Sequence, residues 1–284
     1  MLYSEKVKLF AKQHPCEEIT VDGARYRYVL CGKAGARTLV FLNGGMNTLE
    51  MWLDYVDELS QDYRVLLFDY PQELRTNQEL VMGMRAFFAA LTIKQPIFIG
   101  ASDGGMVAQI YVQKYPGEAG GLILVSTGGM DEATLRTLKQ KYRLAPLMLW
   151  YMKHCNYEKL EPKLISASLR HIRDETPEEI AYAKDIFETT FRDFTQEKDV
   201  HISSLLADLM RQRPVTAADF AALAGRILLI LPNQDFFSEK MQKDLIALMH
   251  DPKIAYVSGG HLSTVLKTQD YVRVIREFLT ETFA

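Results

Sequence analysis

Residues 96–112 read PIFIGASDGGMVAQIYV, and this stretch predicts a strand, a tight turn and a helix in succession. The apolar run 96–99 is followed by the turn Gly-Ala-Ser-Asp-Gly, and from residue 105 onward apolar side chains recur at helical spacing. Glycines flank the turn because neighbouring side chains would clash in so sharp a bend. The turn holds the Ser102 hydroxyl above a helix start, where negative charge is favoured. Read alone, the pattern fits an ordinary strand–helix loop equally well.

The composition is that of an ordinary globular protein. The chain has 284 residues, of which 48% are hydrophobic and 24% are charged, enough for one large α/β domain or a domain with an insertion. The formal net charge of −3 and the pI near 6.1 argue against nucleic acid or an anionic membrane as a partner. We therefore expect the partner to be a small-molecule substrate, and the sequence leaves the oligomeric state open.

The cysteines and the N-terminal residues favour a cytoplasmic protein. Cys16, Cys31 and Cys155 are widely spaced and form neither a disulfide framework nor a metal-binding cluster. The N-terminal stretch is charged and lacks the apolar core of a signal peptide. No apolar run approaches the roughly 20 residues that a membrane span needs.

Strand-like and helix-like patterns alternate along most of the chain. Continuous apolar runs predict strands buried on both faces, and Asp22-Gly23 predicts a hairpin. The expected strands are 17–21, 26–30, 38–42, 64–68, 96–99, 121–125, 226–231 and 253–257, and helices are expected at 4–13, 49–60, 77–92, from 105, 238–250 and 269–283. Such alternation predicts an α/β fold with a mostly parallel, doubly wound sheet covered on both faces.

The alternation stops between about residues 131 and 223, where helical periodicity continues without a strand-like run. Because strands resume afterwards, this region is an insertion over one end of the sheet rather than a terminal domain. We predict a core made of residues 1–128 and 221–284, with a helical lid at 129–220.

Two further residues could complete a catalytic set with Ser102. Asp235 follows the expected strand 226–231, and His261 follows 253–257 after a Ser-Gly-Gly turn. The carboxyl ends of parallel strands meet at one edge of a sheet, where open α/β sheets build their sites. Alone, Asp235 would read as a turn residue or helix cap, and His261 as a surface histidine. Together they supply the base and the orienting group that a serine nucleophile requires.

These residues resemble the α/β-hydrolase superfamily over nearly the whole chain. Segment 39–46 resembles its third strand and oxyanion loop, 100–104 its nucleophile elbow, LPNQD its acid loop and SGGH its histidine loop. The elbow string GASDGG is similar to elbows of the biphenyl-hydrolase-like branch, which includes amino-acid ester hydrolases. The resemblance implies the α/β-hydrolase fold and a serine hydrolase of esterase type.

The resemblance also implies a role for each residue of the set. Ser102 is the expected nucleophile, His261 the general base and then acid, and Asp235 the carboxylate that orients the histidine. Asp131, after the strand 121–125, occupies a second known type of position for the acid and ranks below Asp235. No cofactor is implied, and the scattered histidines lack the spacing of a metal site.

An oxyanion hole is implied at the backbone N–H groups of Asp103 and of Gly45 or Met46. Many relatives have His-Gly where this chain has Asn43-Gly44, which matters little because the donor there is backbone. Many also have a glycine-rich loop after the fourth strand, whereas residues 69–73 contain no glycine. That side of the site is therefore expected to have a different shape.

Three residues are candidates for binding the substrate. Asp103 is the only charged residue in 96–113, and its carboxylate could attract a cationic substrate such as an α-amino ester. The plainer interpretation, an acidic residue favoured in the first turn of a helix, is preferred. Trp150 belongs to an apolar stripe of the lid that could line an acyl pocket or form lid core. Phe236, beside Asp235, is the third candidate.

The sequence therefore predicts a hydrolase that cleaves a small or medium carboxylic ester through a seryl acyl-enzyme. An amide or thioester would suit the same machinery. One alternative is a hydrolase that cleaves a C–C bond next to a ketone with the same three residues. A second alternative is a non-catalytic, hydrolase-like ligand-binding protein, which the intact Ser-Asp-His set disfavours.

Overall fold

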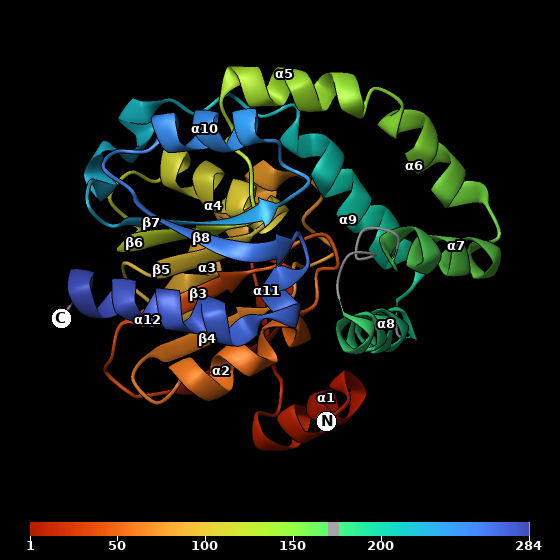
Figure 1. Ribbon diagram of the computed structural model, residues 1–284, viewed down its shortest axis with the longest axis horizontal. Helices are drawn as coiled ribbons and strands as arrows, with labels where there is room; N and C mark the ends of the chain where they lie inside the picture. The colour runs from red at the N-terminus through yellow and green to blue at the C-terminus, as the bar shows by residue number, and fades with distance from the viewer. Residues whose placement is uncertain (170–175, 193, 284) are drawn as a thin grey trace.

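An eight-stranded sheet lies between two layers of helices in the computed structural model, which describes residues 1–169, 176–192 and 194–283 (Figure 1). The strands are β1 (Glu17–Val21), β2 (Ala24–Gly32), β3 (Thr38–Leu42), β4 (Arg64–Phe68), β5 (Ile97–Ala101), β6 (Gly121–Val125), β7 (Ile227–Gln234) and β8 (Lys253–Gly260). Their order is β1-β2-β4-β3-β5-β6-β7-β8. The pairs β1–β2 and β2–β4 are antiparallel and all other pairs are parallel, which confirms the predicted mostly parallel sheet.

The central strands β3, β5 and β6 are buried on both faces because their side chains alternate between two apolar clusters. In β3, Val40 and Leu42 face one cluster, whereas Leu39 and Phe41 face the other. The first cluster packs against α3 (Asn77–Ala90), α4 (Asp103–Lys114) and α10 (Glu239–Leu248). The second packs against α1 (Tyr3–Gln13), η1 (Leu49–Trp52), α2 (Leu53–Leu59) and α12 (Thr268–Phe283).

A series of helices joins β6 to β7 and extends beyond one end of the sheet (Figure 1). They are α5 (Glu132–Lys141), α6 (Ala145–His154), α7 (Tyr157–Leu169), α8 (Pro177–Arg192), α9 (Gln196–Leu209) and η3 (Ala217–Leu223). Residues 170–175 and 193 of the predicted lid lie outside the described residues, and the division at 129 and 220 stays a prediction. No helix in the described ranges has both the length and the apolar character needed to cross a membrane.

The first helix connects this helical series to the core. On one side of α1, the backbone N–H of Ser4 donates to Oδ2 of Asp185 in α8 at 2.9 Å. On the other side, Nζ of Lys6 lies 2.8 Å from Oδ2 of Asp54 in α2. The helix α1 therefore lies between α2 and α8 (Figure 1).

Four strands extend beyond their predicted ends, which corrects the expected boundaries: β2 continues from residue 30 to Gly32, and β5 continues from residue 99 to Ala101. β7 continues from the expected end at residue 231 to Gln234, and β8 continues from 257 to Gly260. A register shift between Pro232 and Gln234 accommodates the proline, and Oδ1 of Asn233 accepts the N–H of Gly259 at 3.0 Å. The prolyl and glycyl residues therefore lie inside irregular strand ends, although their types predicted loops.

Candidate active site

Ser102 occupies a sharp turn between β5 and α4. Its backbone angles, φ 55° and ψ −125°, lie in a region that side-chain-bearing residues rarely adopt. The turn is held by a hydrogen bond from the Ser102 N–H to the Val125 carbonyl at 3.0 Å. The hydroxyl of Thr127 donates to the Ser102 carbonyl at 2.5 Å. Strained backbone fixed on both sides presents the serine side chain beyond the sheet edge.

The glycines of the turn are required by close backbone contacts. A Cβ atom at Gly100 would lie 2.7 Å from the Gly104 carbonyl oxygen. A Cβ atom at Gly104 would lie only 2.3 Å from the Leu42 carbonyl oxygen. The absence of these side chains therefore allows α4 to begin directly against β3 and β5.

The structure brings Ser102, His261 and Asp235 together from the ends of β5, β8 and β7. Nε2 of His261 lies 3.1 Å from Oγ of Ser102, and Nδ1 of His261 lies 2.7 Å from Oδ1 of Asp235. The Asp235 side chain is 1% exposed, whereas the His261 side chain is 26% exposed. The carboxylate is thus enclosed behind the imidazole, and the imidazole edge that meets the serine faces the cavity described below. This is the geometry in which a histidine can take a proton from a serine.

Asp131, the alternative acid, has a different role in the structure. Its Oδ1 accepts the N–H groups of Ala133 and Thr134 at 2.9 and 3.0 Å, so it caps the N-terminus of α5. His261 is hydrogen-bonded to Asp235 instead.

Gly45 and Met46 border the same cavity as Ser102. Within the described part of the chain, the N–H groups of these two residues have no hydrogen-bond acceptor. Unpaired N–H groups beside a serine hydroxyl have the character of oxyanion donors. The loop that carries them runs alongside the start of α4, which provides the Asp103 N–H.

The Asp103 carboxyl group lies against this loop. Its Oδ1 is 3.5 Å from the point where a side chain at Gly44 would begin, and 3.9 Å from that point at Gly45. Burial raises the pKa of Asp103 to about 7, against the opposing effects of its own backbone N–H and of His261. The group therefore changes charge near neutral pH beside the proposed oxyanion donors.

A cavity of about 710 Å³ opens over these residues. Its walls are largely apolar, and they include Met46, Met106, Phe187, Leu209, Phe236 and Leu262. A mostly apolar cavity of this size with a few converging polar groups is typical of small-molecule sites.

The other two candidate binding residues have different positions. Phe236 lines the cavity, and its ring lies edge-on to His261 with the centroids 4.8 Å apart. Trp150 does not line the cavity: it is 60% exposed and lies against His154 on α6. The structure thus places Trp150 neither in an acyl pocket nor in a lid core. The helical spacing of its stripe gives no information on which face of α6 is turned inward.

Sequence reasoning missed the lid residues that do border the cavity. Lys141 and Tyr142 come from the end of α5, Phe187 from α8, and Leu206 and Leu209 from α9. Nζ of Lys141 lies 4.6 Å from the centroid of the Phe236 ring. The lid residues named here belong to three separate segments whose meeting point depends on lid packing, so no local sequence signal marks them.

Comparisons with known proteins agree with this fold. Residues 37–164 match a family model described as alpha/beta hydrolase fold. Proline iminopeptidase PfmaB of Pestalotiopsis fici is 33% identical over 145 residues, which cover 46% of this chain and 51% of that protein. The chain spans about half or less of the length of the curated relatives that it matches.

Solved structures match over nearly the whole chain. A hydrolase from Pseudomonas aeruginosa is similar with a TM-score of 0.73 at 20% identity, covering 93% of this chain and 98% of that one. A thermophilic esterase from Thermogutta terrifontis is similar with a TM-score of 0.71 at 17% identity, covering 95% and 99%. At these identities the likeness concerns the fold.

Proposed function

Because the chain belongs to the α/β-hydrolase superfamily, we propose that it is a serine hydrolase that cleaves small or medium carboxylic esters. The observation that carries the proposal is the hydrogen-bonded series from Ser102 through His261 to Asp235, with distances of 3.1 and 2.7 Å. A serine in a strained turn, a histidine within reach of its proton and a buried carboxylate behind that histidine form the requirements for acyl transfer.

In the proposed reaction, Oγ of Ser102 attacks the ester carbonyl carbon while Nε2 of His261 accepts the hydroxyl proton. The negative charge that develops on the carbonyl oxygen is stabilised by the N–H of Asp103 and that of Gly45 or Met46. His261 then donates its proton to the leaving alcohol, and the acyl group remains on Ser102. Water, deprotonated by the same histidine, releases the acid, while Asp235 orients the imidazole and stabilises its charged form throughout.

A fluorophosphonate probe tests the proposal, because it labels only an activated serine. We expect wild-type protein to be labelled and Ser102→Ala to be unlabelled, with kcat on p-nitrophenyl acetate reduced by about 10⁴-fold or more. Ser126→Ala is a suitable control, because Ser126 also borders the cavity but makes no hydrogen bond with His261. Unlabelled wild type would favour the binding-protein alternative, and label retained by Ser102→Ala would reject the assigned nucleophile.

A second measurement is needed to determine which type of bond is cleaved and whether the substrate carries a charge. The likeness to a proline iminopeptidase and the carboxyl group of Asp103 support a second candidate, a substrate with a free α-amino group. Neutral p-nitrophenyl esters of graded acyl length, amino-acid esters and amino-acid p-nitroanilides separate esterase from aminopeptidase activity. A vinylogous diketone substrate would reveal C–C bond hydrolysis. The three separated, unpaired cysteines support our proposal of a cytoplasmic location.

A further inference from the structure

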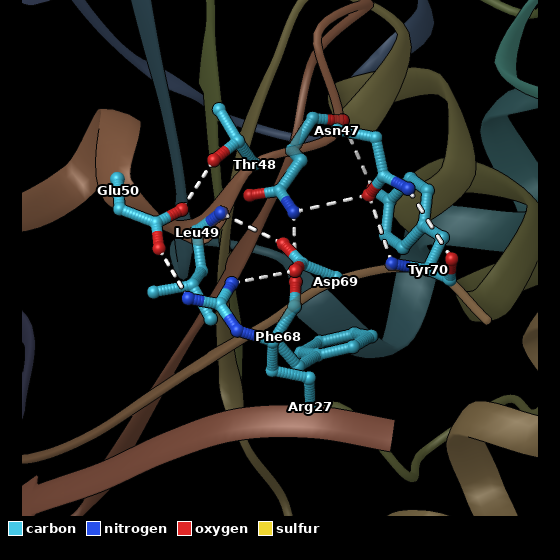
Figure 2. A network of polar contacts seen from close by, with 9 residues as sticks. Arg27, Asn47, Thr48, Leu49, Glu50, Phe68, Asp69 and Tyr70 are labelled. Carbon is cyan, nitrogen blue, oxygen red and sulfur yellow. Dashed lines mark hydrogen bonds and ion pairs between the residues drawn. The ribbon is translucent and has the colours of Figure 1, made fainter. Parts of the chain in front are cut away.

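The loop after β3 is tied at several points to the segment after β4. We define residues 43–50 as the oxyanion loop, because Gly45 and Met46 lie in it. Figure 2 shows the polar contacts that join it to Phe68, Asp69 and Tyr70, and to Arg27 of β2. Residues 69–73 contain no glycine, and the side chains of Asp69 and Tyr70 contribute contacts to the loop.

The loop begins at Asn43, which is fully buried. Its Nδ2 donates to the Phe68 carbonyl at 2.7 Å, and its Oδ1 accepts the indole N–H of Trp52 at 3.0 Å. The Tyr70 hydroxyl donates to the Asn43 backbone carbonyl at 3.0 Å. Both the side chain and the peptide that precedes Gly44 are therefore fixed.

Asn47 closes the loop on the other side of the glycines. Its backbone has a left-handed φ of 39°, and its N–H donates to the Gly44 carbonyl at 2.8 Å. Its side chain is 2% exposed and holds both polar groups of the Tyr70 backbone. Oδ1 accepts the Tyr70 N–H at 2.8 Å, and Nδ2 donates to the Tyr70 carbonyl at 3.2 Å (Figure 2).

An ionic cluster holds the end of the loop. Oδ1 of Asp69 accepts the Leu49 N–H at 2.9 Å, while its Oδ2 accepts Nη1 of Arg27 at 2.7 Å. Arg27 also donates to Glu50, and Glu50 accepts the Thr48 hydroxyl (Figure 2). Burial alone would raise the pKa of Glu50, but its hydrogen bonds and charge contact with Arg27 outweigh burial and lower it.

We propose that Asn47 is a positioning residue that holds the Gly45 and Met46 N–H groups toward the oxyanion, with Tyr70 as its anchor. A loop containing two adjacent glycines has many accessible conformations, and donors for a developing charge stabilise it best when they are already in place. Asn47 limits these conformations in two ways. Its backbone N–H holds the turn by donating to the Gly44 carbonyl, and its side-chain amide attaches the loop to the backbone of Tyr70. This inference rests on the proposed function of the same site.

Asn47→Gly tests the inference, because glycine adopts a left-handed φ without strain while the contacts of the Asn47 amide with Tyr70 and Asn43 are lost. With p-nitrophenyl acetate we expect kcat to fall about 10- to 100-fold with KM changed less than about threefold, as for lost transition-state contacts. The affinity for an alkyl trifluoromethyl ketone, whose adduct with Ser102 carries an oxyanion, should weaken by a similar factor. Tyr70→Phe, which removes the hydroxyl bond to Asn43, should shift both quantities in the same direction by a few-fold.

Phe278→Leu is the control for lost stability, because Phe278 is buried on α12 and its ring packs against Phe283 at the end of that helix. It should lower the free energy of unfolding while leaving kcat and ketone affinity near wild type. If Asn47→Gly and Tyr70→Phe lose stability but keep kcat and ketone affinity, the inference is wrong and the role is merely structural. Unlabelled wild type in the fluorophosphonate assay would instead reject the proposed function, and the inference with it.

Discussion

Ser102 and Asp103 are adjacent in the turn, but their side chains have very different surroundings. The Ser102 hydroxyl faces His261, whereas the Asp103 carboxyl lies against the glycines of the oxyanion loop. Because burial raises the pKa of Asp103 to about 7, its carboxyl group is neutral in mildly acidic solution and ionised above neutrality. An ionised carboxylate near a developing oxyanion opposes it, although the same charge would attract a cationic substrate.

We therefore predict a fall in kcat for neutral esters as the pH rises through about 7, where Asp103 ionises. Asp103→Asn should abolish this fall, because an amide stays neutral at every pH. For amino-acid esters, the same substitution should raise KM by about tenfold, the value of one favourable charge contact of about 1.4 kcal/mol. The measurement is a pH profile of kcat and KM for matched neutral and amino-acid esters.

Equal proportional losses on both ester classes at every pH would rule out selection by charge. An alkaline fall that persists in Asp103→Asn would assign that limb to another group.

The role of Asn47 could not be predicted from the sequence around any single residue. The order of Ser102, Asp235 and His261 could be predicted because each follows a strand-like run and carries its own local pattern. Asn47 is 23 residues from Tyr70, its partner, and nothing in either neighbourhood marks the pair. Trp150 was predicted to line a pocket or a core from spacing alone and does neither, since spacing does not define which side faces the protein.

The position of helix α4 depends on how closely its first turn approaches the sheet. Gly104 lies at the start of α4, where a methyl group would meet the backbone oxygens of Leu42 and Asn43 at 2.3 and 2.6 Å. These oxygens belong to the backbone at the end of a central strand, so they cannot move aside as the end of a flexible side chain could. The contact therefore determines both the position of the helix and the direction of the Asp103 N–H.

We predict that Gly104→Ala lowers the free energy of unfolding by about 1–3 kcal/mol, the usual cost of overpacking a core. Catalytic turnover should fall with it, because α4 must shift. Gly45→Ala is the matched control, since the nearest atom to its new methyl group would be 3.9 Å away. Urea denaturation compares the two variants, and equal stabilities would show that the contact is not tight in solution.

The core strands could be predicted from sequence because burial on both faces leaves an uninterrupted apolar run, as in β3 and β6. The ends of β7 and β8 could not, because a register shift at Pro232 lets residues typical of turns remain paired. The helices of the lid were visible as periodic segments. Their mutual packing depends on side chains from distant segments, so the composition of the cavity wall could not be read beforehand.

The chain connects the lid to the core at both ends of the lid, and contacts with α1 connect the two a third time. Phe187 of α8 lines the cavity, and the same helix receives the Ser4 N–H from α1 through Asp185. The first helix thus lies next to a wall of the site, although it ends at Gln13, far from Ser102 in the sequence. Sequence periodicity predicted α1 as a helix but not its place beside the lid.

The hydrogen bond between Ser102 and His261 joins residues that are 159 positions apart. The chain must therefore assemble β5, β6, β7 and β8 in register before the serine can become reactive. Contacts of such long sequence separation form late, because a large loop must close before they contribute. Helices and local turns, by contrast, form within microseconds.

Fluorophosphonate labelling during refolding from urea should consequently lag behind the recovery of far-ultraviolet circular dichroism. Labelling that recovers together with the helical signal would contradict this order of events. The late gain of reactivity has a consequence for the nascent protein. During synthesis the serine leaves the ribosome well before its histidine. The incomplete chain therefore has no active nucleophile while it is still unfolded.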